Sequence, residues 1–298
     1  MTGKLYVCAT PIGNLQDITL RVLSVLSSVA VIAAEDTRHT RKLLSFHGIS
    51  RPLVSYHEHN KQEAGAALIQ RLQAGEDIAL VTDAGMPAIS DPGRDLVSAA
   101  AGAGITVVPV PGPSAVTAAL SVSGLFADEF TFVGFLPRGA KRLLGLLDEF
   151  RYQKRALVAY ESPRRLVSSL EVIAAFDPGR RICVTRELTK VHEEVFRGAV
   201  SEARDFFSAK EVLGEITVIV EGAKPGPGAK AGHGAETEAA GKAHGAEQRE
   251  TAQGEALDEV MRLVQGGMPL NEAVRTVAAK TGLKRNELYR LALARKLG

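Results

Sequence analysis

The sequence predicts two α/β domains followed by a small all-α module, and three observations support this fold class. Short apolar runs alternate with amphipathic segments over the first 223 residues, a pattern typical of α/β proteins. Pro111-Gly112-Pro113 interrupts that alternation, and a second series of strands follows it. From 224 to 254 no aliphatic residue larger than Ala occurs, so this segment cannot bury enough surface to become ordered. We therefore expect domains over 1–112 and 113–223, a flexible linker over 224–254, and a helix-turn-helix-like module over 255–298.

The first domain is expected to contain a mainly parallel sheet with helices on both faces, because its strands alternate with helices. Asp17 is the expected cap of the first helix, which would carry Ile18, Val22, Leu26 and Val29 on one face. A further helix is expected over 63–73. The expected strands are Lys4–Ala9, Val31–Ala34, Pro52–Tyr56, Ile78–Val81 and Ile105–Val110.

The second domain is expected to contain a second series of strands with helices between them, after the Pro-Gly-Pro joint. Its expected strands are Phe130–Phe135, Leu157–Tyr160, Arg181–Thr185 and Ile216–Val220. Its expected helices are Ala115–Val122, Ala140–Glu149, Pro163–Ala175 and Ser201–Phe207.

The C-terminal module is predicted to contain three short helices. Leu257, Val260, Met261 and Val264 form one helical stripe, and helices over 271–280 and 285–297 flank a turn at Gly282. From 255 to 298 the chain has eight Lys or Arg against five Asp or Glu, an excess compatible with phosphate contact. A protein-docking or dimerisation bundle is the alternative interpretation.

The composition, 45% hydrophobic and 23% charged, is that of a soluble globular protein. Cys8 and Cys183 each lie in an apolar strand, so we expect reduced core residues rather than a disulfide framework. No apolar run approaches the length of about 20 residues that spans a bilayer. The N-terminus enters a strand directly, without the pattern of a signal peptide. We expect a cytoplasmic protein without membrane contact.

The loop between Val81 and Gly93 is the strongest candidate for a binding site. It follows a buried strand and is rich in Gly, Pro and Ala between Asp83 and Asp91, so backbone can approach a ligand closely. Asp91-Pro92 would cap and open the next helix. Open α/β sheets bind ligands beyond the carboxyl ends of their strands. An ordinary connection is the alternative.

Several common motifs are missing from the chain. There is no GxxxxGK[ST], no GxGxxG after a strand, no GxSxG and no HExxH. His57 and His59 would project to one side of an extended segment, but no third ligand accompanies them, so we predict no metal site.

A set of loop motifs, taken in order, resembles one group of enzymes. The motifs are Thr10–Leu15, Glu35–Arg38, His57–Asn60, Asp83–Pro87, Pro111–Ala115, Tyr160–Pro163 and Arg186–Lys190. Together they resemble the 16S rRNA cytidine-2′-O-methyltransferases of the tetrapyrrole methylase superfamily, over about residues 4–222. The tail resembles the helix-turn-helix extension of the same group. Met86 departs from the pattern, since threonine is expected there.

The resemblance implies a cleft between the two α/β domains that holds S-adenosylmethionine, and a homodimer. A zwitterionic, partly apolar ligand suits a cleft of small residues with a few convergent polar groups. For the apolar members of the set, core packing is the alternative role. By position, the cofactor-binding residues would be Ile12, Asp83, Met86, Ile89, Ser114, Ala115, Tyr160, Glu215 and Ile216.

The implied reaction is attack of a ribose 2′-hydroxyl on the sulfonium methyl. A hydroxyl is a poor nucleophile until its proton leaves, so a general base is expected. Glu35, Asp36 and Glu187 are the candidates, and Arg38 or Lys190 would lower the effective pKa of the hydroxyl. Each acid has an alternative role as a salt-bridged anchor, Glu35 with Arg38 or Glu187 with Arg186.

The expected substrate is 16S rRNA of the small ribosomal subunit. Two alternatives are a tetrapyrrole methylase of the same fold and a non-catalytic ribosome-assembly factor. Cations in loops and at helix starts are candidates for RNA phosphate contacts. They are Arg41, Lys42, Arg138, Lys141, Arg142, Arg164, Arg165, Lys284, Arg285 and Arg290.

Overall fold

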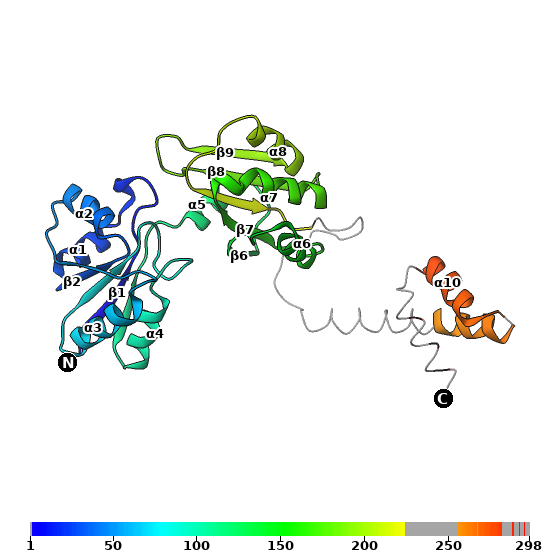
Figure 1. The fold of residues 1–298 in the computed structure, drawn as a ribbon, viewed down its shortest axis with the longest axis horizontal. Coiled ribbons are helices and arrows are strands. Elements are labelled where there is room, and N and C mark those ends of the chain that lie inside the picture. The colour runs from blue at the N-terminus through cyan, green and yellow to red at the C-terminus, as the bar shows by residue number, and fades with distance from the viewer. Residues whose placement is uncertain are drawn as a thin grey trace. The chain divides into compact units, whose positions relative to one another are not determined.

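The computed structural model describes residues 2–223, 256–266 and 268–281, together with 288, 292 and 295. The chain forms two compact units, Met1–Pro227 and Gly228–Gly298. The first unit contains two five-stranded sheets (Figure 1). The predicted linker over 224–254 lies outside the described residues.

The first sheet is entirely parallel, with strand order β3-β2-β4-β1-β5, as the alternation of strands and helices predicts. Every residue of β2 and β4 is buried, which is typical of parallel strands covered on both faces. The strands are β1 (Lys4–Cys8), β2 (Val31–Ala34), β3 (Leu53–Ser55), β4 (Ile78–Val81) and β5 (Thr106–Val110).

Helices cover both faces of this sheet, which confirms the predicted arrangement of helices. Consecutive strand residues point to opposite faces, so each strand contributes to two cores. Leu26 and Leu44 share one core with Cys8, whereas Leu68 and Leu96 pack on the other face. The helices are α1 (Leu20–Ser28) and α2 (Thr37–Phe46) on the first face, and α3 (Lys61–Gln73) and α4 (Arg94–Gly102) on the second.

The predicted start of the first helix is wrong. Asp17 ends a short 3₁₀ helix, η1 (Leu15–Asp17), whose N-cap is Asn14. Thr19 caps α1 instead, since its hydroxyl accepts the backbone N–H of Val22 at 3.2 Å. The Pro-Ile-Gly-Asn loop is thus followed by one turn of 3₁₀ helix before α1 begins.

The predicted start of α4 at Asp91-Pro92 is also wrong. The helix begins at Arg94, and Gly93, with φ of +134°, precedes it. A side chain at Gly93 would contact Leu80 at 3.0 Å, so glycine is needed both for conformation and for space. Asp91 therefore remains in the loop, where it is available to a ligand.

The second sheet is mixed, with order β6-β7-β10-β8-β9. Only β6 and β7 pair in parallel, and the other three pairs are antiparallel. The strands are β6 (Phe130–Phe135), β7 (Ala156–Glu161), β8 (Arg181–Arg186), β9 (Glu194–Ala199) and β10 (Ile216–Val220). The edge strand β9 was not predicted, because its sequence EVFRGA has only a short apolar pattern.

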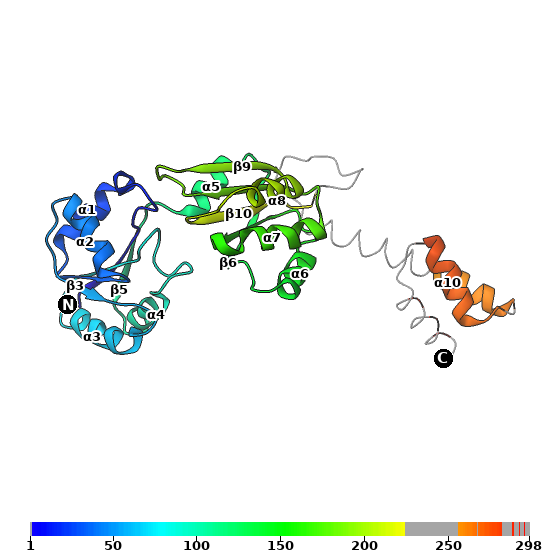
Figure 2. The same cartoon turned by 45° about the horizontal axis from the view of Figure 1, so that its top comes forward.

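Three helices cover one face of the second sheet and α5 (Ala115–Ser123) packs on the other. These three are α6 (Ala140–Glu149), α7 (Pro163–Phe176) and α8 (Val200–Ser208). In both views α6 and α7 lie side by side (Figures 1 and 2). Because α5 follows Pro111-Gly112-Pro113 directly, the chain passes from one sheet to the other at that joint.

Cys8 and Cys183 are buried and free, as the sequence predicts. Burial raises the pKa of the Cys8 thiol to about 12 and that of Cys183 to about 11. Both side chains are therefore unreactive core residues at neutral pH.

The second unit has a helix over 256–265 and a second helix, α10 (Leu270–Thr281). Val260, Val274 and Val277 are buried together, and Leu288 and Ala292 join this core. The first two predicted helices are confirmed, whereas most of the third, over 285–297, lies outside the described residues. Within the described ranges, no helix combines the length and the hydrophobicity that a membrane crossing requires.

Candidate active site

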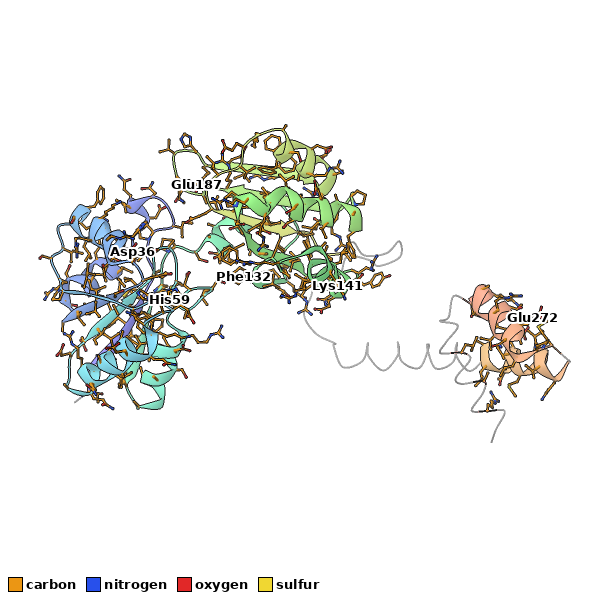
Figure 3. All side chains as sticks on the ribbon, viewed as in Figure 1. Asp36, His59, Phe132, Lys141, Glu187 and Glu272 are labelled. Carbon is orange, nitrogen blue, oxygen red and sulfur yellow. The ribbon has the colours of Figure 1, made fainter. Side chains whose placement is uncertain are left out.

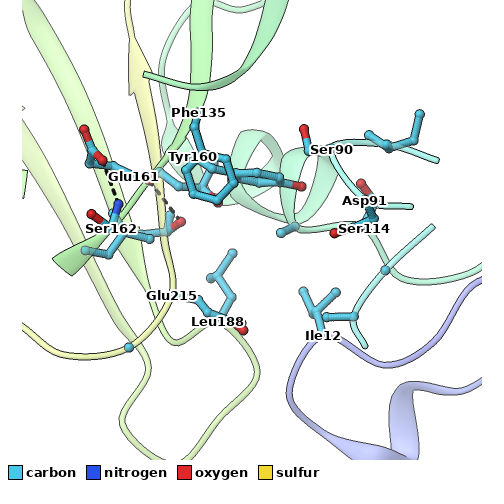
Figure 4. Close-up of a pocket in the computed structure, with 18 of the residues that line it drawn as sticks. Ile12, Ser90, Asp91, Ser114, Phe135, Tyr160, Glu161, Ser162, Leu188 and Glu215 are labelled. Carbon is cyan, nitrogen blue, oxygen red and sulfur yellow. Dashed lines mark hydrogen bonds between the residues drawn. The ribbon is translucent and has the colours of Figure 1, made fainter. Parts of the chain in front are cut away.

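The larger of two adjoining pockets has a volume of about 400 Å³ and is lined from both sheets (Figure 4). The loop after β1 contributes Ile12, and the loop after β4 contributes Met86 and Asp91. The end of β7 and the segment before β10 contribute Tyr160 and Glu215. Eight of the nine predicted cofactor-binding residues line it, all except Asp83: Ile12, Met86, Ile89, Ser114, Ala115, Tyr160, Glu215 and Ile216.

Backbone contacts fix the loops on the first-domain side of this pocket. Thr10 and Gly85 exchange two backbone hydrogen bonds, at 2.9 and 3.1 Å, which join the loops after β1 and β4. Ala88 and Ser90 have φ values of +69° and +64°, in the left-handed region that side chains disfavour. Strain of this kind is retained where surrounding structure enforces it, often at ligand sites.

A buried carboxylate fixes the second-domain side. The Glu161 side chain has no exposed surface, and it accepts hydrogen bonds from the Ser162 N–H (2.7 Å), Arg165 (2.8 Å) and the Ser169 hydroxyl (2.6 Å). The loop after Tyr160 is thereby held against the start of α7. Arg165 also donates to the Leu136 carbonyl at 2.6 Å, which favours a structural role over the predicted RNA contact.

The smaller pocket, of about 380 Å³, shares Ile12, Ala84 and Glu215 with the larger one. Asp83, predicted to bind the cofactor, lines this pocket and not the larger one. Its remaining walls come mainly from the loop after β1, the first turns of α2 and Lys190.

Lys190 is held between two carboxylates at the edge of the smaller pocket. Its ammonium donates to Glu187 Oε1 at 2.8 Å and to Glu215 Oε2 at 3.1 Å, and Glu187 Oε1 also accepts the Glu215 N–H at 2.9 Å. A Cβ added at Gly13 would lie 2.5 Å from Lys190 Cγ, so glycine lets this loop of the second domain close on the first.

These contacts set the charge of both groups. Burial alone would lower the pKa of Lys190, but the hydrogen bonds that its ammonium donates to Glu187 and Glu215, and their negative charges, outweigh burial and raise the pKa. Burial would raise the pKa of Glu187, yet the Lys190 hydrogen bond and charge and the Glu215 N–H lower it overall. Lys190 is therefore a firmly protonated cation, and Glu187 is a firmly ionised anion.

The anchoring pairs expected for the acids are wrong. Arg38 pairs with Asp36 at 2.7 Å rather than with Glu35, and Arg186 pairs with Glu194 at 2.9 Å rather than with Glu187.

Of the two neighbouring acids, only Glu35 faces the β4 end. It accepts a hydrogen bond from the Thr82 hydroxyl at 2.6 Å. Asp36 instead caps α2, and the hydrogen bonds from Arg38 hold its pKa far below the usual range. Such a carboxylate is a weak base, so Asp36 is the poorest of the three candidates.

Asp91 was not predicted as a site residue, although it lies in the loop singled out from the sequence. It lines the larger pocket, and burial together with the negative charge of Glu35 raises its pKa to about 6. Phe135 and Leu188 were missed as well, because a strand end and a loop leucine carry no signal of their own. Thr40 and His39 of the smaller pocket were missed for the same reason.

Most of the candidate RNA contacts are surface cations. Exposed on α2, at the start of α6 and on α7 are Arg41, Lys42, Arg138, Lys141, Arg142 and Arg164. Figure 3 labels Lys141 on α6. Lys284, Arg285 and Arg290 lie outside the described residues.

His57 and His59 are the two histidines considered for a metal site. Their ring centroids lie 5.9 Å apart. Among the residues that the structure describes, no three or more His, Cys, Asp or Glu side chains are grouped as metal ligands.

Comparison with known proteins decides the family. The model of the tetrapyrrole (corrin/porphyrin) methylases matches residues 4–204, and that of the RsmI C-terminal HTH domain matches 251–296. Ribosomal RNA small subunit methyltransferase I of Synechocystis sp. is 41% identical over 98% of both chains. The chain belongs to this family of methyltransferases. The enzymes of this family are S-adenosylmethionine-dependent methylases.

Other proteins named ribosomal RNA small subunit methyltransferase I match this chain as well. The Pseudomonas aeruginosa protein of that name is 42% identical over 99% of this chain and 98% of its own length. The Thermotoga maritima protein is 48% identical over 74% of this chain but 99% of its own length. About a quarter of this methyltransferase therefore has no counterpart in that relative.

Solved structures show how the two sheets of this methyltransferase relate to known folds. Uroporphyrin-III-C-methyltransferase from Thermus thermophilus superposes with a TM-score of 0.51 at 21% identity, over 73% of this chain and 94% of that one. Diphthine synthase gives 0.57 at 14% identity, over 73% and 89%. At these identities the likeness shows the fold alone.

The larger pocket fits S-adenosylmethionine by its chemistry. Its volume lies within the range of about 300–1,000 Å³ typical of small-ligand sites. Ile12, Met86 and Leu188 give it apolar walls, and the Asp91 and Glu215 carboxylates suit a ligand with positive charge. Ser114 and Tyr160 add hydroxyl groups. When bound there, the cofactor supplies an electrophilic methyl group on a sulfonium.

Proposed function

We propose that this methyltransferase methylates the ribose 2′-hydroxyl of a cytidine in 16S rRNA of the small ribosomal subunit. The observation that carries the proposal is the match along nearly the whole chain to proteins named ribosomal RNA small subunit methyltransferase I. The loop motifs, in their order, resemble those of cytidine-2′-O-methyltransferases. From this resemblance we infer that the acceptor is a ribose 2′-hydroxyl and that the base is cytosine. The two adjoining pockets give room for a methyl donor and an acceptor.

Proximity is the first contribution of the chain. The sulfonium methyl is already activated, so holding an acceptor oxygen in line with it supplies much of the acceleration, up to about 7–11 kcal/mol in favourable cases. Ile12, Ala84 and Glu215 line both pockets and so mark the place where donor and acceptor meet. The joined loops after β1 and β4 keep that place rigid.

Lys190 and Glu215 are the residues to which we assign the handling of the proton. The Lys190 ammonium lies 3.1 Å from Glu215 Oε2, at the shared wall. Lys190 donates to the ribose oxygen and stabilises its developing negative charge, while Glu215 accepts the proton. Glu187, bonded to both residues, positions them. Glu35 and Asp36 are each engaged elsewhere, with Thr82 and Arg38.

We assign the second unit and the surface cations to RNA binding. The T. maritima relative matches over nearly its whole length while leaving a quarter of this chain unmatched, which supports an accessory role for the remainder. A truncation after Ala223 is expected to lower affinity for the subunit and to leave cofactor binding unchanged. Calorimetry and filter binding on the two forms test this.

We also propose that the protein is a homodimer, as the resemblance implies. Val122, Phe126 and Phe130 are exposed large apolar residues close in sequence, and a second copy would cover such side chains. Light scattering on the purified protein measures the mass directly. A monomer at micromolar concentration would contradict this assignment.

Transfer of a tritiated methyl group to small ribosomal subunits that lack the modification tests the proposed function. Nucleosides from the labelled RNA are then separated and identified by mass. The expected product is 2′-O-methylcytidine at a single position. Label on a base, or on a tetrapyrrole but not on RNA, would contradict the proposal.

A further inference from the structure

The smaller pocket differs from the larger one in the chemistry of its walls. Its polar residues include His39, Asp83 and Lys190, beside three threonines and Glu215, whereas the larger pocket has Met86 and several other apolar groups. Its volume of about 380 Å³ also falls within the range of about 300–1,000 Å³ for small-ligand sites. The pocket is thus suited to a polar ligand that is recognised by hydrogen bonds.

Asp83 lines this pocket, and among the described residues only one of its two carboxyl oxygens has a hydrogen-bond partner. Its Oδ1 accepts the Asp36 N–H at 3.2 Å, which fixes the orientation of the carboxyl group. In the part of the chain that the structure describes, no donor is bonded to Oδ2. Burial and the negative charge of Glu35 raise the pKa of Asp83, so its ionised form lacks stabilisation. A ligand that brings an N–H group would supply it.

The base of a target nucleotide provides such a group. We propose that the smaller pocket binds the target nucleoside, turned out of the RNA strand, and that Asp83 Oδ2 accepts a hydrogen bond from the exocyclic amine of cytosine. This inference rests on the proposed function. A carboxylate can accept from cytosine N4, whereas uracil offers only the acceptor O4 at that position. His39 lies in the same pocket, and imidazole rings stack on unpaired bases.

The geometry gives a specific prediction for Asp83→Asn. The amide oxygen keeps the Asp36 N–H, so the NH₂ group takes the place of Oδ2. This group then faces the cytosine amine, donor against donor, but it matches uracil O4. We expect the ratio of kcat/KM for cytidine over uridine at the target position to fall by about tenfold or more, the discrimination typical of one base contact. The substrates are reconstituted small subunits that differ only at that nucleotide.

Asp91→Asn is the matched control, because it removes the same charge from the larger pocket. It should leave the ratio of cytidine to uridine within about twofold while changing cofactor affinity. Circular dichroism and thermal unfolding check that both variants fold. The wild-type protein provides a second, independent test, because its kcat/KM should be higher for cytidine than for uridine at the target position.

The outcomes separate this inference from the proposed function. A lower ratio in Asp83→Asn but not in Asp91→Asn supports the inference. Equal loss on both nucleotides in Asp83→Asn, or equal rates on cytidine and uridine in the wild type, overturns it and leaves 2′-O-methylation standing. If the wild type methylates no ribose in either subunit, the proposed function itself fails.

Discussion

The two pockets adjoin each other, but different features shape them. The larger one depends on backbone: Gly85, Ala88 and Ser90 adopt left-handed conformations that bring a loop of small residues round its side. The smaller one depends on charged side chains fixed by hydrogen bonds, above all Lys190 and Asp83. Under the proposed function we infer a division of labour, in which shape holds the methyl donor and fixed charges act on the acceptor.

Replacing Lys190 with Met should distinguish the roles of the two pockets most strongly. It removes a cation bonded to Glu215, so kcat for methyl transfer should fall by about 10²- to 10³-fold, as for the loss of a transition-state hydrogen bond. Cofactor affinity should change by less than about threefold, because Lys190 does not line the larger pocket. Lys210→Met, at a lysine paired with Glu194 and lining neither pocket, is the control. An equal loss in cofactor affinity would contradict the division of labour.

Glu161→Ala tests whether the larger pocket relies on a buried anchor. The substitution removes the buried carboxylate that binds Ser162, Arg165 and Ser169, and removing one member of a buried pair typically costs about 3–5 kcal/mol. The free energy of unfolding of the first unit should fall by about 3 kcal/mol in denaturant titrations. Glu171→Ala, at an exposed position on α7, should stay within about 0.5 kcal/mol. A similar small loss for Glu161 would show that the anchor is dispensable.

The pH dependence of cofactor affinity should identify Asp91 as a contact. Its pKa of about 6 means that the carboxylate, the form that attracts a cationic ligand, is lost as the pH falls through 6. Affinity measured by calorimetry should fall by up to about tenfold between pH 7 and pH 5. Asp91→Asn should remove this dependence. If the variant keeps the full pH profile, another group is responsible.

A lysine outside both pockets should have the smallest effect. Lys141→Ala on α6 should weaken binding to the small subunit by a few-fold and reduce the salt slope of binding by about one. Lys4→Ala, at the amino end of β1 and therefore away from the loops, is the control. Equal effects of the two substitutions would mean that the charge acts non-specifically.

The fold of the first domain could be predicted because its signals are local. Buried parallel strands such as Ile78–Val81 are short apolar runs, and the helices between them have clear apolar faces. The strand β9 could not be predicted, since EVFRGA is stabilised by pairing with β8 along the whole edge rather than by its own pattern. Long-range pairing is not visible in a single sequence.

The larger pocket was predictable residue by residue only through the resemblance to a family. Small-residue loops at strand ends marked its place, but Ile12 and Ala115 alone favour core packing. The smaller pocket could not be predicted. It forms where α2 brings His39 and Thr40 beside Asp83, and the left-handed turn at Glu187 brings Lys190 across from the second domain.

A crystal structure of the protein with S-adenosylhomocysteine and a short RNA containing the target cytidine would test the central claim most directly. The account predicts the cofactor product in the larger pocket, its sulfur near Glu215, and the cytosine amine within hydrogen-bonding distance of Asp83 in the smaller one. A cofactor product that extends through both pockets, with the cytidine bound elsewhere, would contradict it.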